Sequence, residues 1–147
     1  MRGRAFIVIA AVTMGLGACT PDGDDPGPVD TGGLTRAQYD AAVNLARHEV
    51  ETQDAEVTLA TAVLKHNAGR NAPSNTGHPC TGDEVLKVRL IGTFPHTVTT
   101  GTPGGGSTTV TEMDIKADPA TGDACLIGVG TGKDARPQPG ATVLQLG

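Results

Sequence analysis

The pattern of apolar and polar positions divides the chain into an apolar leader, a polar spacer, one amphipathic helix and several short strands. An apolar run at residues 5–14 follows two arginines, and residues 20–33 contain no periodic apolar pattern. Beyond residue 33 the apolar positions recur first with the period of a helix and then with that of strands. The pattern predicts a single small domain over residues 34–147.

A helix is predicted over residues 35–53. Thr35 is a candidate N-cap after Leu34, and Gln38 completes the pattern of a capping box. The apolar residues that recur at helical spacing are Tyr39, Ala42, Val43, Ala46 and Val50. Because most of these side chains are small, the stripe favours a helix packed on a sheet over a coiled coil.

Four strands are predicted after the helix. The apolar residues that alternate with polar or small neighbours are Val57, Leu59 and Val63 in the first strand, Leu86, Val88 and Leu90 in the second, and Met113 and Ile115 in the third. The fourth covers residues 124–129, after a proline- and glycine-containing turn at 118–123. The residues after Gly130 form a polar C-terminal tail, in which residues 143–146 could add a short edge strand.

Charged residues between the apolar ones indicate which strands are neighbours. If the second and third strands pair, Lys87 and Arg89 lie near Glu112 and Asp114. Opposite charges across strands stabilise such a pair by roughly a few tenths of a kcal/mol. The expected fold class is therefore α+β, with one N-terminal helix packed on a four-stranded antiparallel sheet.

The leader has the composition of an export signal, because Arg2 and Arg4 precede the apolar run and small residues follow it. As a helix, residues 5–18 would span about 21 Å, which is less than the bilayer core of roughly 30 Å. A transmembrane anchor is therefore disfavoured, and an ordinary cleaved secretory signal remains an alternative.

The residues Leu16-Gly17-Ala18-Cys19 resemble the lipobox of bacterial lipoproteins. This resemblance implies that residues 1–18 are a signal peptide and that Cys19 carries the lipid at the new N-terminus. Residues 19–33, rich in proline, glycine and aspartate, are then expected to be the lipidated N-terminus and a flexible tether. We therefore expect a protein held on the extracytoplasmic side of the cell membrane by the lipid on Cys19.

Charge narrows the classes of partner. The formal net charge is −5, and it becomes −7 when residues 1–18 and their two arginines are removed. Nucleic-acid phosphates select surfaces rich in lysine and arginine, so nucleic acid is excluded as a partner. The expected mature chain has only Tyr39 and Phe94 as aromatic residues, so its core must be built mainly from aliphatic side chains.

Two cysteines remain once Cys19 carries lipid. Cys80 and Cys125 allow one pairing, and export implies an oxidising compartment, so we expect a disulfide. Closing a loop of about 46 residues stabilises a fold by roughly 4 kcal/mol in the chain-entropy model. The alternative is a pair of metal-binding or redox thiols, which the absence of a CxxC spacing disfavours.

Residues for catalysis or metal binding are few. The serines Ser74 and Ser107 lie outside any GxSxG motif, so no catalytic residue is assigned and the chain is expected not to be an enzyme. The four histidines are His48, His66, His78 and His96, and their spacing matches no metal site. No cofactor or metal is therefore expected.

One segment is a candidate partner-binding edge. Phe94, Pro95 and His96 come just after the apolar part of the second strand and before the glycine-rich loop 101–106. Loops on a rigid scaffold commonly carry binding residues, which favours this interpretation. The alternative is that Phe94 caps the core at a strand end.

The layout over residues 35–130 resembles the small PepSY-like or cystatin-like modules of exported bacterial proteins. A helix followed by strands, with the hairpin sequence Asp-Pro-Ala-Thr-Gly at 118–122, carries the resemblance. PepSY-like domains are associated with restraint of secreted proteases. The first hypothesis is therefore a non-enzymatic lipoprotein that binds or regulates another envelope protein. The alternative is a small-ligand or metal-binding lipoprotein that assists transport.

Overall fold

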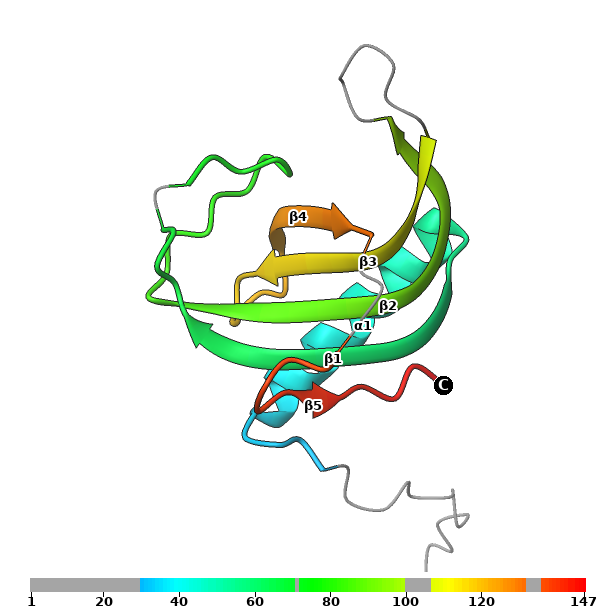
Figure 1. Cartoon of the computed structure of the whole chain (residues 1–147). Coiled ribbons are helices and arrows are strands. Elements are labelled where there is room, and N and C mark those ends of the chain that lie inside the picture. Colours follow the sequence, from blue (N-terminus) through cyan, green and yellow to red (C-terminus); the bar gives the residue numbers. More distant parts are fainter. Residues whose placement is uncertain (1–29, 71, 100–106, 132–135) are drawn as a thin grey trace, which may run out of the picture.

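The protein is described by a computed structural model that covers residues 30–70, 72–99, 107–131 and 136–147. These residues form one helix and five strands: α1 (Arg36–Gln53), β1 (Glu56–His66), β2 (Glu84–Thr99), β3 (Ser107–Ala117), β4 (Ala124–Gly130) and β5 (Thr142–Val143). The strands make one antiparallel sheet in the order β4-β3-β2-β1-β5, and α1 covers one face of it (Figure 1). The α+β class is confirmed, and the sheet has five strands rather than the predicted four.

The helix begins where its capping residues place it. Gln38 N donates to Thr35 Oγ1 at 3.2 Å, and Thr35 N donates to Gln38 Oε1 at 3.0 Å, so the predicted capping box is present. Leu34 is buried in the core just before the cap. The predicted stripe faces the sheet, since Tyr39, Ala42, Val43 and Ala46 are buried and Val50 is partly buried.

The core lies between α1 and the face of the sheet that α1 covers, which we call the inner face. The predicted inward residues of β2 and β3 are all buried there: Leu86, Val88, Leu90, Met113 and Ile115. Four buried alanines, at 42 and 46 on α1 and at 60 and 62 on β1, belong to the same core. Such short side chains allow the backbone of α1 to lie close to β1.

A β-bulge in β1 changes which residues face the helix. The register shifts between Val57, which lies opposite Gly92, and Leu59, which lies opposite Ile91. Val57 and Ala60 therefore both contact the core, whereas Leu59 and Val63 belong to the opposite, outer face. The predicted uninterrupted alternation, with Val57, Leu59 and Val63 on one face, is wrong because the extra residue at the bulge reverses it.

The bulge is matched by a glycine on β2. A Cβ at Gly92 would overlap the carbonyl oxygen of Glu56 and lie 2.8 Å from the Cα of Val57. Only glycine therefore allows β1 and β2 to approach at this point. The segment 92–99, expected to lie beyond the strand, continues β2 with further register shifts at Phe94 and Thr97.

The turn between β3 and β4 has the expected chemistry. Asp118 Oδ1 accepts from Ala120 N at 2.8 Å and from Thr121 N at 3.1 Å, and Gly122 has a positive φ of 77°. An aspartate that bonds to the following backbone and a glycine in the left-handed region are typical of tight turns. This hairpin aligns β4 with β3.

The C-terminal tail completes the sheet and the core. Leu144 N donates to Ala60 O at 2.9 Å, and the side chain of Leu144 is only 5% exposed. Thr142 Oγ1 donates to Thr31 O at 2.9 Å, which joins the end of the predicted tether to β5. The edge strand lies at Thr142–Val143 rather than at the expected 143–146, and residues 30–33 pack with the domain.

Candidate functional site

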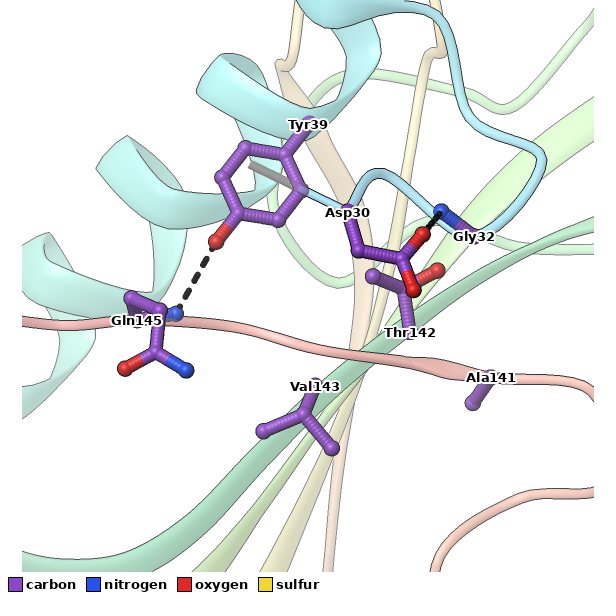
Figure 2. Close-up of a pocket in the computed structure, with 7 residues that line it drawn as sticks. All are labelled: Asp30, Gly32, Tyr39, Ala141, Thr142, Val143 and Gln145. Atoms are coloured by element: carbon purple, nitrogen blue, oxygen red, sulfur yellow. Dashed lines mark hydrogen bonds between the residues drawn. The ribbon is translucent and has the colours of Figure 1, made fainter. Parts of the chain in front are cut away.

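A groove runs along one side of the domain, between α1 and the C-terminal residues 141–147. Its first hollow, of about 470 Å³, is lined by Asp30, Gly32, Tyr39, Ala141, Thr142, Val143 and Gln145 (Figure 2). A second hollow shares Tyr39 and Gln145 with the first, and a third shares Arg47 and Gly147 with the second. The edge strand β5 thus forms part of the wall of an open, elongated groove.

The backbone of β5 presents hydrogen-bonding groups to this groove. Because Leu144 N bonds to Ala60 O, the alternation of an antiparallel strand directs the N–H and C=O of Val143 away from β1. The next outward N–H, that of Gln145, donates to the hydroxyl of Tyr39 at 3.1 Å (Figure 2). The side chain of Val143 is 50% exposed. An edge of this kind can pair with an extended peptide.

The opposite edge of the sheet is covered by side chains. Asn75 Nδ2 donates to Ile127 O at 2.7 Å, and Ile127 N donates to Asn75 Oδ1 at 2.9 Å. Thr76 Oγ1 donates to Ala124 O at 2.6 Å. The amide of Asn75 therefore occupies the position that a neighbouring strand would take at Ile127. The two edges of the sheet differ, because β4 is capped at its centre and β5 faces a groove.

The predicted disulfide is present and holds the loop that caps β4. Cys80 and Cys125 are bonded, with their Cα atoms 5.3 Å apart. Asn67, only 3% exposed, donates its Nδ2 hydrogens to Cys80 O at 3.0 Å and Gly82 O at 2.9 Å. The connection between β1 and β2 is therefore tied to the sheet at both ends.

A charged cluster lies on the outer face of the sheet. Arg89 bonds to both carboxylate oxygens of Asp114, at 2.8 and 2.9 Å, and lies 3.1 Å from a carboxylate oxygen of Glu112. The hydrogen bond with Asp114 raises the pKa of Arg89. Partial burial acts to lower this pKa, but the negative charges of Asp114 and Glu112 raise it further, so the net shift is upward. The predicted charge match is confirmed for Arg89. It is wrong for Lys87, which lies opposite Lys116.

Phe94, the first residue of the candidate partner-binding edge at Phe94, Pro95 and His96, is not available for binding. Phe94 is 1% exposed and belongs to the core, so the folded domain does not offer its ring to a partner. With so few large side chains, the core takes the ring, as the alternative interpretation expected. Pro95 is exposed, and the His96 side chain lies outside the described residues, as do Cys19 and the loop 101–106.

Sequence reasoning missed the groove, because the groove exists only once the tail and residues 30–32 have docked. The one available signal was the group of apolar residues Val143, Leu144 and Leu146 near the end of a mostly polar tail. Among the described residues, no three His, Cys, Asp or Glu side chains form a group that could hold a metal ion. Within the same residues no helix is long and apolar enough to cross a membrane.

Comparisons with protein-family models, with curated proteins and with solved structures return no match. The lipobox and the PepSY-like or cystatin-like layout remain resemblances on which a prediction rests.

Proposed function

We propose that the chain is a membrane-anchored lipoprotein of the cell envelope and acts as a non-enzymatic binding module. The lipid on Cys19 attaches it to the extracytoplasmic side of the membrane, and residues after Cys19 tether the domain. The folded domain binds an extended segment of another envelope protein along β5. The proposed location rests on the Leu-Gly-Ala-Cys sequence at 16–19. The Cys80–Cys125 disulfide is also typical of proteins in an oxidising compartment.

The main support for a binding role is that the two edge strands of the sheet, β4 and β5, differ in what covers their outward backbone groups. Proteins commonly cap or shorten edge strands to prevent pairing with other chains. Here Asn75 caps Ile127 at the centre of β4. On β5 the flanking outward N–H groups are engaged within the domain, Ala141 N by Gln138 O and Gln145 N by the Tyr39 hydroxyl. Between them, Val143 directs its backbone groups into a groove. A peptide strand added at Val143 would gain main-chain hydrogen bonds, and the groove would receive its side chains.

The test places a photo-crosslinking amino acid at Val143 in the native host. The matched control is the same probe at Val129 on β4, because these two valines are similarly exposed, at 50% and 46%. We expect a discrete crosslinked envelope protein from position 143 and none from position 129. Equal crosslinking at both positions, or none at 143, would contradict the proposed site.

A second variant tests the pairing itself. Val143→Pro removes only an N–H that points away from β1, and proline is tolerated on an edge strand at such a position. We expect this variant to fold and to lose crosslinking from a probe at Gln145, whereas Val143→Thr, which keeps the N–H, retains it. Retention of crosslinking by the folded proline variant would exclude pairing through the N–H of residue 143.

A further inference from the structure

Three of the chain's four lysines surround one hollow on the outer face of the sheet. The hollow has a volume of about 300 Å³, and its lining includes Lys65, Lys87 and Lys116 together with Val85 and Asn67. We call it the lysine pocket. It lies on β1, β2 and β3, on the face away from α1, and so is separate from the groove along β5.

The strand register brings the lysines together. Lys87 and Lys116 are directly opposite each other on β2 and β3. Lys65 lies opposite Val85, two residues from Lys87 on the same face of β2. Like charges directly opposite across strands destabilise a sheet, and diagonal neighbours are only about 7–8 Å apart. The fold therefore bears an electrostatic cost at this place.

The carboxylates nearest the three lysines along β2 and β3 are engaged by other groups. On the outer face of β3, Asp114 and Glu112 are both engaged by Arg89. Near the start of β2, Asp83 is paired with Arg70. Within the described ranges, the ion pairs involve arginines and none of the three lysines. The lysine pocket is thus locally cationic in a chain whose net charge is −5.

One wall of the pocket is fixed by hydrogen bonds to the backbone around the disulfide-bonded Cys80. Asn67 lines the pocket and bonds through its amide to Cys80 O and Gly82 O. The lining of a small neighbouring hollow includes Asn67, Lys116, Cys80 and Cys125. The strands and Asn67 therefore hold the backbone part of the hollow in place before any ligand binds, which lowers the ordering cost of binding.

We propose that the lysine pocket binds a phosphate group. Lysine ammonium groups are compact point charges that suit phosphate, and a doubly charged oxyanion would relieve the repulsion between Lys87 and Lys116. The phosphate can belong to a free small molecule or to a lipid headgroup of the membrane. This inference does not depend on the proposed binding of a protein at β5.

The test measures binding of inorganic phosphate to the full chain, reconstituted in phosphatidylcholine vesicles, by calorimetry at low ionic strength. We expect one phosphate per chain, with affinity about tenfold weaker in Lys87→Gln and in Lys116→Gln, since each removes a facing charge. The matched control is Arg36→Gln, which removes one positive charge from an exposed ion pair on α1. Equal weakening in all three variants, or no heat in the unmodified chain, would overturn the proposal.

Thermal unfolding gives a readout that does not depend on calorimetric heat. Without phosphate, Lys87→Gln and Lys116→Gln should unfold at a higher temperature than the unmodified chain, because the repulsion is relieved. Phosphate should raise the unfolding temperature of the unmodified chain and of Arg36→Gln more than that of either lysine variant. An equal rise in all four proteins would show that phosphate acts only as a general stabilising salt, and would reject the site.

A second reconstitution distinguishes the two sources of phosphate. If the pocket binds a headgroup, vesicles of phosphatidylglycerol will abolish the heat of phosphate binding and Lys87→Gln will lose the phosphatidylglycerol-dependent rise in unfolding temperature. If the ligand is free, phosphate binding will persist in phosphatidylglycerol vesicles. Either result supports a phosphate site and assigns its source.

Discussion

At the scale of single residues, two buried threonines on the neighbouring strands β1 and β5 differ in whether their hydroxyls have a hydrogen-bond partner. Thr61 is fully buried on β1, and among the described residues its Oγ1 has no hydrogen-bond partner. Thr142 on β5 is also buried, and its Oγ1 donates to Thr31 O at 2.9 Å. Burying a hydroxyl without a partner costs free energy, whereas a satisfied one stabilises modestly.

We therefore expect Thr61→Val to leave the free energy of unfolding unchanged or to raise it by up to about 1 kcal/mol. Thr142→Val should lower it by about 1 kcal/mol, because the bond to Thr31 is lost. Urea unfolding of the two variants under identical conditions measures both effects. A clear loss of stability in Thr61→Val would mean that its hydroxyl is hydrogen-bonded after all.

Gly92 marks the point where β1 and β2 approach most closely at the bulge. In Gly92→Ala the new methyl group meets the backbone of Glu56 and Val57, so we expect a loss of about 1–3 kcal/mol. Gly130→Ala is the control in the same sheet, because its Cβ would meet nothing closer than 4.0 Å. Chemical denaturation of both variants checks the comparison, and equal losses would contradict it.

At the scale of elements, what the sequence predicts depends on how local each signal is. The capping box of Thr35 and Gln38 and the alternation in β2 and β3 lie within a few residues, and both are confirmed. The bulge at residue 58 changes which residues of β1 face the helix. It arises from the pairing of β1 with β2, so no feature of the β1 sequence alone predicts it. The two-residue β5 is too short to show a periodic pattern, so neither it nor the groove beside it can be predicted without the assembled fold.

Among the elements, the capped edge of β4 yields a third prediction. Asn75→Ala removes two hydrogen bonds to Ile127, so we expect a loss of about 1 kcal/mol and self-association through the exposed edge. Sedimentation velocity over a range of concentrations measures the association. Thr52→Ala, at an exposed position of α1 outside the groove, is the control and should remain unchanged in mass. A monomeric Asn75→Ala at all concentrations would show that Asn75 does not protect the edge.

At the scale of the whole molecule, the disulfide both stabilises the fold and is consistent with the proposed extracytoplasmic location. Cys80 and Cys125 are 45 positions apart, and the bond between them holds the loop that contains both Asn67 and Asn75. The pairing followed from counting cysteines in an expected exported chain, and the structure confirms it. The structural role of the loop could not be predicted, because its polar sequence has no pattern of its own.

Reduction of this bond should lower the free energy of unfolding by roughly 4 kcal/mol in the chain-entropy model. The measurement is equilibrium unfolding of the oxidised protein against a Cys80→Ala, Cys125→Ala double variant. Comparable stability of the two proteins would show that the bond constrains the unfolded chain far less than its loop length implies.

The central claim, a lipid-anchored and disulfide-bonded envelope protein, is tested most directly by the intact mass of the protein purified from membranes of its host, with and without reduction. The account predicts the mass of residues 19–147 plus a diacylglyceryl group, increasing by two hydrogens on reduction. An unmodified mass with free thiols would contradict it, and would return Cys80 and Cys125 to consideration as reactive or metal-binding groups.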